Sequence, residues 1–174
     1  MSVASRTVLA VVVNLLLALC PGHAAHTQTA ASSNPGREST VTTRASGTFE
    51  VELTPQAADA GAAGAAIGRL IIDKQFHGDL EGTSSGVMLA ARTAIPNSAG
   101  YVALEQVRGT VGGRTGTFML QHSGTMNRGA ASLVLTVVPD SGTDGLMGIS
   151  GSMAIIIEGK QHSYTFDYAI TGPP

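Results

Sequence analysis

From Thr43 to Ile170, β-branched and aromatic residues alternate with small or polar ones, and glycine-marked turns interrupt the pattern at short intervals. A period of two is typical of strands with one buried face. The pattern predicts about eight strands. They are expected at residues 43–53, 66–76, 79–90, 100–109, 113–123, 130–138, 146–157 and 161–170.

The connections between these strands are short enough to be hairpin turns, as at His77–Asp79, Thr110–Gly113 and Glu158–Lys160. Successive hairpins make neighbouring strands antiparallel. We therefore expect an all-β meander closed into a barrel, because closure removes the exposed sheet edges, with a two-sheet sandwich as the alternative. Glycines inside the strands favour the barrel, since strong coiling needs positions without side-chain bulk. These glycines are Gly47, Gly82, Gly86, Gly116, Gly148 and Gly151.

The first residues are typical of an export signal. Arg6 supplies a positive charge, and Val8–Cys20 is an apolar stretch too short to span a membrane comfortably. Small residues at positions 22 and 24 favour cleavage after Ala24, with Ala25 as a close second. We expect residues 1–24 to be a signal peptide and the protein to be exported, either to the periplasm or outside the cell.

Cys20 is the only cysteine in the chain. Cleavage would therefore leave a protein without disulfides, a thiol nucleophile or a thiolate metal site. A lipid anchor on Cys20 is an alternative, but Leu19 stands where that processing prefers a small residue. An uncleaved anchor helix is another, which the polar Asn14 and the short apolar length disfavour.

Residues 25–42 are predicted to be a disordered tether, because they are rich in small polar residues and lack apolar periodicity. The barrel domain would cover residues 43–172, which is long enough to bury a core. Within it, Pro55–Ala66 is rich in alanine and glycine and is predicted to be a mobile loop.

Ten basic and twelve acidic residues give a formal net charge of −2, and loss of Arg6 would leave nine against twelve, or −3. This balance offers no basic surface for nucleic acid or for an anionic membrane. We expect neither as a partner of the cleaved protein. A small apolar ligand and a second copy of the chain remain open as partners.

Several unusual strings follow one another along the chain. They are GTFEV (47–51), FHGDLEGTSSGVML (76–89), SAGYVALEQVRG (98–109), GRTGTFMLQHSGTM (113–126), VVPDSGTDGLMGISG (137–151) and HSYTFDY (162–168). Their order resembles one bacterial family, known only as domain of unknown function 3224. The similarity runs from about Ala45 to Ile170 and implies an antiparallel barrel similar to that of allene oxide cyclase. It implies no activity, because the family has none assigned.

Glu105 is the one acidic residue in an otherwise strand-like run, YVALEQ. A two-residue loop at Val111–Gly112 or Gly112–Gly113 would place odd-numbered residues of strand 100–109 on the same face as even-numbered residues of strand 113–123. The opposite face is richer in hydroxyl and amide groups, so we assign it to the outside. The predicted inner face carries Tyr101, Ala103, Glu105, Val107, Arg114, Gly116, Phe118, Leu120 and His122.

Two interpretations of Glu105 are open. Partial burial among aromatic rings could raise the pKa of its carboxyl group, and His122 or Tyr101 could complete an acid–base pair. Alternatively, Glu105 pairs with Arg114 or hydrogen-bonds Tyr101, and so fixes the register of the sheet. The catalytic candidates are therefore Glu105 and His122.

The last strand places His162, Tyr164, Phe166 and Tyr168 on one face. This row is typical of a core, although a barrel lined with tyrosines could also hold an apolar ligand that has a polar group. The candidate ligand-binding residues are Tyr101, Glu105, Arg114, Phe118, His122, Tyr164, Phe166 and Tyr168.

Two other patterns carry little weight. Gly82–Gly86 reads GTSSG and matches the nucleophile motif G-x-S-x-G, but that motif requires a strand followed by a helix, which this region does not predict. No metal or other cofactor is expected, because His77, His122 and His162 lie far apart in the sequence and lack metal-ligand spacing.

Three classes of function follow. An exported barrel that binds a small apolar or amphipathic molecule in its lumen is favoured. An isomerase or cyclase, by analogy with allene oxide cyclase, and a purely structural domain are the alternatives, so enzymatic activity stays open. An open lumen containing Glu105 would keep the first two classes, whereas a barrel filled by side chains would remove both.

The export signal can be tested by the intact mass of the protein purified from its native host. Cleavage predicts a chain that begins at Ala25 or His26. A full-length chain, or a product acylated at Cys20, would contradict it.

Overall fold

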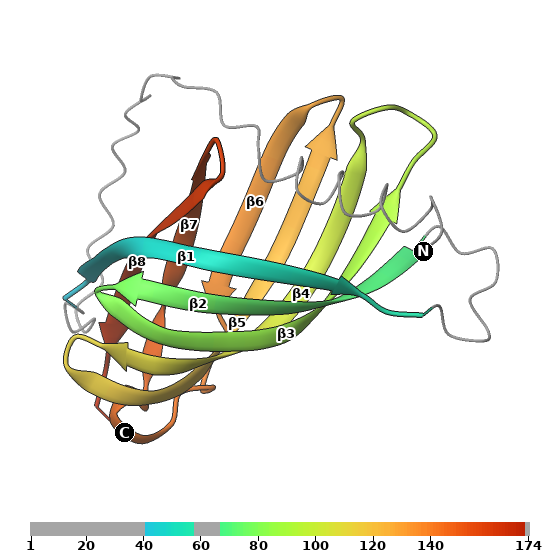
Figure 1. Cartoon of the computed structure of the whole chain (residues 1–174). Helices are drawn as coiled ribbons and strands as arrows, with labels where there is room; N and C mark the ends of the chain where they lie inside the picture. Colours follow the sequence, from blue (N-terminus) through green and yellow to red (C-terminus); the bar gives the residue numbers. More distant parts are fainter. Residues whose placement is uncertain (1–40, 58–66, 173–174) are drawn as a thin grey trace, which may run out of the picture.

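The computed structural model describes residues 41–57 and 67–172. Eight antiparallel strands follow one another round a closed barrel in sequence order (Figure 1). The only helical element in the described ranges is a short 3₁₀ turn, η1 (Asp144–Leu146), and no helix there is long and apolar enough to cross a membrane. The strands are β1 (Thr43–Pro55), β2 (Ile67–Gly78), β3 (Leu80–Arg92), β4 (Ala99–Val111), β5 (Arg114–Asn127), β6 (Ala130–Val137), β7 (Ile149–Glu158) and β8 (Gln161–Ile170).

The predicted antiparallel barrel is confirmed, because β1 pairs with both β2 and β8 and so closes the sheet. The largest differences from the predicted strands lie in β5 and β7. β5 continues to Asn127, since its alternation runs on to the hairpin, and β7 begins only at Ile149, because Asp144–Leu146 forms η1. The predicted signal peptide, nearly all of the tether and most of the Ala-Gly loop lie outside the described residues.

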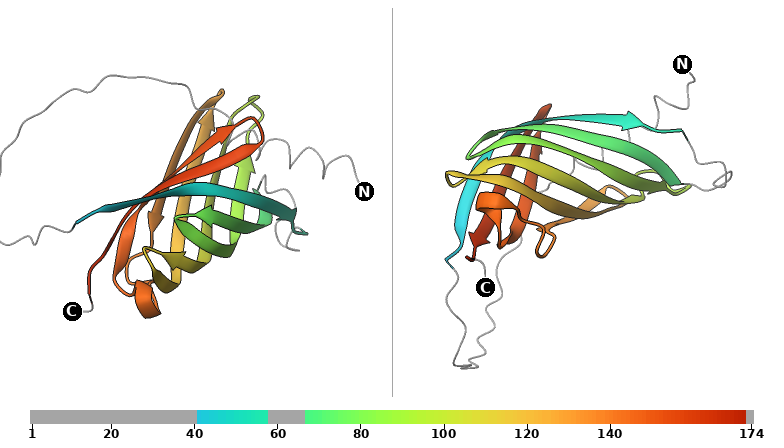
Figure 2. Two further views of the ribbon diagram at one scale, coloured as in Figure 1. Left: turned by 60° about the vertical axis from the view of Figure 1, so that its left-hand side comes forward. Right: turned by 90° about the horizontal axis from the view of Figure 1, so that it is seen from below.

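The barrel is closed more tightly at one end than at the other. The β1–β8 ladder ends at Phe49 and His162, although β1 continues along β2 as far as Pro55. β7 and β8 form a hairpin between β6 and β1, and β6 pairs with β7 only at Thr136 and Ser152. The β7–β8 hairpin therefore stands apart from β6 at its tip, while β1 to β5 form one continuous curved sheet (Figures 1 and 2).

Two groups of apolar side chains fill the interior. The larger group contains a row of aromatic rings, in which Phe166 lies 5.7 Å from Phe118 and 5.2 Å from Tyr168 between ring centroids. Burial of each such ring stabilises the fold by about 1.5–3 kcal/mol. The smaller group lies on β2 to β5 and consists of Leu70, Ile72, Met88, Tyr101, Ala103 and Met126.

Gly86 of β3 lets two strands approach closely beside Glu105, its partner on β4. A Cβ atom at position 86 would lie 2.3 Å from the Leu104 carbonyl oxygen and 2.5 Å from the Glu105 Cα. Both contacts are with backbone atoms, which cannot move aside as the end of a flexible side chain can. Gly86 therefore fixes how near β3 comes to the part of β4 that carries Glu105.

We expect Gly86→Ala to lower the free energy of unfolding by about 1–3 kcal/mol, because the added methyl group overpacks the sheet. Gly68→Ala in β2 is the matched control, since its Cβ would meet nothing nearer than the Ala90 carbonyl oxygen at 3.9 Å. Urea titration of both variants measures the difference. Equal midpoints would show that the approach of β3 and β4 is not fixed by Gly86.

Candidate functional site

Four adjacent strands each turn one polar side chain into the barrel. They are Lys74 of β2, Ser84 of β3, Glu105 of β4 and His122 of β5, and we call them the Glu105 cluster. Strand register brings them together, because Lys74 is paired with Ser84, and His122 is paired with Ala103, two residues from Glu105. Residues two apart on a strand share a face.

The carboxylate of Glu105 is the centre of this cluster. Its Oε1 accepts hydrogen bonds from Lys74 Nζ at 2.7 Å and from His122 Nε2 at 3.0 Å, and its Oε2 accepts one from Ser84 Oγ at 3.1 Å. Glu105 is 0% exposed, and the side chains of Lys74 and His122 are 4% and 3% exposed. The cluster is therefore a buried ion pair with two further donors, which is the form in which a buried charge is tolerated.

Burial by itself would raise the pKa of the Glu105 carboxyl group. The charge of Lys74 and the hydrogen bond from His122 outweigh burial and lower that pKa to about 2. Of the two interpretations that the sequence leaves open, the one with a raised pKa is wrong, because it did not include Lys74. Glu105 is ionised at neutral pH and has no proton to give as a general acid.

Lys74 is the partner that the sequence interpretation missed. It occupies the place proposed for Arg114, which is exposed at the start of β5 and pairs with Val111 at the far end of β4. The ammonium group of Lys74 also lies 5.3 Å from the centroid of the Phe49 ring, within the range of a cation–π interaction. Strand alternation could have found Lys74, because it shares a face with the buried Ile72.

A small cavity of about 20 Å³ adjoins the cluster. It is large enough for about one water molecule. Three polar side chains stand on its otherwise apolar wall: Lys74, Tyr101 and His122. The apolar side chains of the wall are Phe49, Val51, Leu53, Ile72, Met88 and Ile155.

The hydroxyl group of Tyr101 forms no hydrogen bond within the described residues. Burial and the nearby charge of Glu105 both raise the pKa of Tyr101, so the hydroxyl group stays protonated. The cavity therefore has a hydrogen-bond donor on its wall that no described protein group uses.

The remaining ligand-binding candidates lie away from this cavity. Phe118, Phe166 and Tyr168 are buried in the aromatic row of the larger core group. Tyr164 is also buried there, and its hydroxyl accepts a hydrogen bond from the Leu80 backbone N–H at 2.9 Å. The end of the barrel that contains this aromatic row is therefore filled by its own side chains.

Ser84 lies in the middle of β3 and donates to a carboxylate. This setting differs from the strand-to-helix turn of a hydrolase nucleophile, so the GTSSG string is not such a motif. The sequence feature that could have placed Ser84 in the barrel is the alternation of buried and exposed positions along β3. Within residues 41–57 and 67–172, no group of three or more His, Cys, Asp or Glu residues could hold a metal ion.

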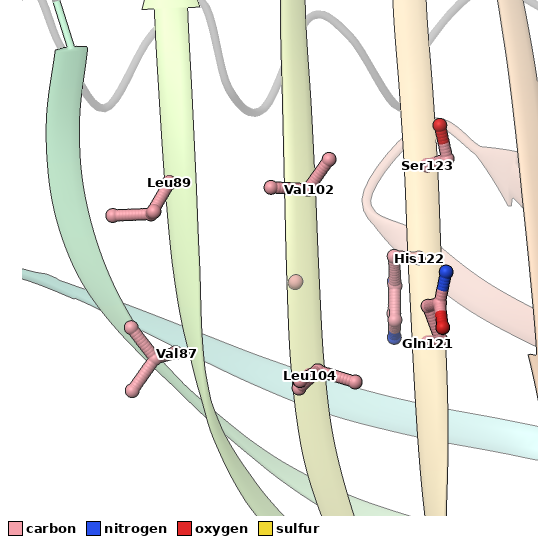
Figure 3. A pocket seen from close by; sticks show the side chains of 8 residues that line it. Val87, Leu89, Val102, Leu104, Gln121, His122 and Ser123 are labelled. Carbon is pink, nitrogen blue, oxygen red and sulfur yellow. The ribbon is translucent and has the colours of Figure 1, made fainter. Parts of the chain in front are cut away.

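A second hollow, of about 520 Å³, lies over the outer face of β3 to β5 (Figure 3). Val102 and Leu104 on this face are 55% and 49% exposed, in agreement with the predicted outer face of β4. Gln121 and Ser123 of β5 also line the hollow, as Figure 3 shows. His122 of the Glu105 cluster also lines the hollow, whereas Lys74, Ser84 and Glu105 do not.

The model of a protein family of unknown function, DUF3224, matches residues 45–168. The chain belongs to this family. A solved structure of a DUF3224 protein of unknown function from Shewanella oneidensis MR-1 is 47% identical, covers 76% of this chain and 100% of its own, and superposes with a TM-score of 0.71. No curated protein matches the chain. The family membership predicted for this DUF3224 chain is confirmed, and the likeness to allene oxide cyclase stays a prediction.

We expect Lys74→Met to destabilise the protein by about 3–5 kcal/mol, because it leaves the Glu105 charge buried without its cationic partner. The double variant Lys74→Met/Glu105→Gln should recover most of this loss, since no buried charge remains. Free energies of unfolding from urea titrations compare the two. A double variant as unstable as the single one would show that lost packing, and not charge, accounts for the effect.

The lowered pKa of Glu105 also predicts a loss of stability in acid. Its contribution is complete above its ordinary pKa of 4.5 and is lost as the pH falls toward about 2, because the unfolded chain takes up the proton more readily. A shift of this size corresponds to about 3 kcal/mol. Unfolding measured between pH 6 and pH 2 should show this loss in the wild type and not in Lys74→Met/Glu105→Gln. The double variant keeps the acid response of the other carboxylates. If wild type and double variant lose stability identically between pH 6 and pH 2, the loss does not come from Glu105.

Proposed function

We propose that this protein is an exported barrel that binds a small amphipathic molecule at the less tightly closed end of the barrel. The polar group of the ligand would lie in the small cavity, against Lys74, Tyr101 and His122. The observation that carries the proposal is the unused hydrogen-bonding capacity on that wall. The Tyr101 hydroxyl has no partner among the described residues, and one hydrogen bond is seen for Lys74, whose ammonium group has three N–H donors.

The size of the cavity decides which part of a ligand it can take. About 20 Å³ accommodates an oxygen-sized group and no hydrocarbon chain. The apolar part would therefore lie on Val51 and Leu53, which are half-buried on the stretch of β1 that extends beyond its ladder with β8. We call these two residues the mouth. Covering them would remove further apolar surface from water.

Apolar side chains fill most of the interior, which argues against the expected ligand in an open lumen, so the proposal is confined to the small cavity and the mouth. The aromatic end of the barrel is filled by Phe118, Phe166 and their neighbours, which argues against a ligand there. The export part of the proposal is supported by the sequence, in which a charged residue, an apolar stretch and small residues follow in the order of a signal peptide.

Binding can be tested with nonan-2-one, a neutral amphipathic probe with one carbonyl group, by protein-observed NMR titration. We expect saturable binding that Leu53→Asn weakens about tenfold, because the mouth loses apolar surface. Leu104→Asn is the matched control on the outer face and should leave the affinity unchanged. If nonan-2-one does not bind, or if Leu104→Asn has the larger effect, the mouth is not the binding site.

A further inference from the structure

His122 and Glu105 form an imidazole–carboxylate pair in which one nitrogen of the ring is already committed. The carboxylate of Glu105 is ionised and Lys74 donates to its Oε1, so the bond of 3.0 Å from His122 Nε2 to the same oxygen requires a proton on Nε2. In neutral His122, the lone pair is then on Nδ1. The tautomer of the ring is thus set by the buried carboxylate.

Nδ1 of His122 is the ring nitrogen that Glu105 does not use. No described residue hydrogen-bonds Nδ1, and no fully enclosed side-chain nitrogen or oxygen in the described part of the chain lacks a partner. Nδ1 is therefore not sealed in the core. His122 forms part of the wall of the small cavity, on the same side as Tyr101, whose ring centroid lies 6.3 Å from the centroid of the imidazole.

The same cavity offers donors for an oxygen atom. Lys74 and Tyr101 both line it, and Lys74 is held there by Glu105 and by contact with the Phe49 ring. A positively charged N–H and a neutral O–H directed at one oxygen stabilise negative charge that develops on it. A base and two such donors on one wall are the elements of a proton-transfer site.

We propose that this cluster catalyses proton transfer at a carbon next to a carbonyl group. His122 Nδ1 removes the proton, the electron pair of the C–H bond forms a C=C bond, and the carbonyl π pair moves to the oxygen, where Lys74 and Tyr101 donate hydrogen bonds. Return of the proton from Nδ1 to the same or a conjugated carbon restores the carbonyl group and the neutral imidazole. The step is redox-neutral and needs no co-reactant.

Glu105 and Ser84 act in this step as positioning residues. The ionised carboxylate holds the Nε2–H tautomer and stabilises the imidazolium ion that forms when Nδ1 takes up a proton. Ser84 donates to the second carboxylate oxygen and so fixes its orientation. The inference rests on the proposed function, because the carbonyl compound must first bind at the mouth.

The test uses nonan-2-one with the full-length protein in deuterium oxide, with loss of the signals of the protons next to the carbonyl followed by proton NMR. Wild type should accelerate exchange, and His122→Gln, which keeps a donor toward Glu105 but has no base, should lower the protein-catalysed rate by about a hundredfold or more. Tyr101→Phe should lower it about tenfold without loss of stability, since the hydroxyl has no partner in the described residues. The half-buried His77→Gln variant, outside the cavity, should exchange the probe at the wild-type rate.

The outcomes separate this inference from the proposed function. Binding of nonan-2-one without accelerated exchange would overturn proton transfer and leave the binding function standing. Failure of the probe to bind would overturn both. Equal loss of rate in His122→Gln and His77→Gln would assign the exchange to imidazole in general, and would also overturn the inference. A wild-type rate in Tyr101→Phe, which should remain folded, would remove Tyr101 from the site.

Discussion

The buried carboxylate of Glu105 constrains the part of the barrel from β2 to β5. Its two oxygens accept hydrogen bonds from Lys74 of β2, Ser84 of β3 and His122 of β5. A slip of one residue in any of these strands would turn the donor to the outer face and leave the charge at 0% exposure with one partner fewer. An incorrect register in this region therefore costs both apolar burial and solvation of a charge.

The two ends of the barrel differ because the ladders differ in length. At one end, β1 and β8 pair from Thr43–Tyr168 to Phe49–His162, and the aromatic side chains of β8 fill the interior. At the other end, β1 continues without β8, and β6 forms no pair with β7, because their single pair, Thr136–Ser152, lies level with Asp167 at the first end. The Glu105 cluster lies next to the small cavity, whose wall includes Val51 and Leu53 from the stretch of β1 that pairs with β2 but not with β8. The cluster is thus buried and still adjoins a cavity large enough for about one water molecule.

Strand positions and the inward direction of Glu105 and His122 could be predicted, because one short hairpin fixes the register of β4 against β5. The side chains that bind the Glu105 carboxylate could not be predicted in the same way. Lys74 lies two strands from Glu105, so its position depends on two further registers and on the packing of its side chain against Phe49. Arg114 was the only cation on the face that could be counted, and the interpretation with a raised pKa took account of the burial of Glu105 but not of a cation beside it. A carboxylate has a raised or a lowered pKa according to its partners, which are a tertiary property.

Stability alone does not explain the whole cluster. A buried ion pair is often no more stabilising than apolar side chains of the same volume, so Lys74 and Glu105 need a reason other than core energy. Fixing the register is one such reason, and the hydrogen bonds from Lys74, Ser84 and His122 Nε2 serve it. His122 adds a third donor to the carboxylate and directs its other nitrogen to no described protein group. That nitrogen contributes nothing to register, while the lining of one cavity by His122, Lys74 and Tyr101 is the arrangement that the proposed proton transfer requires.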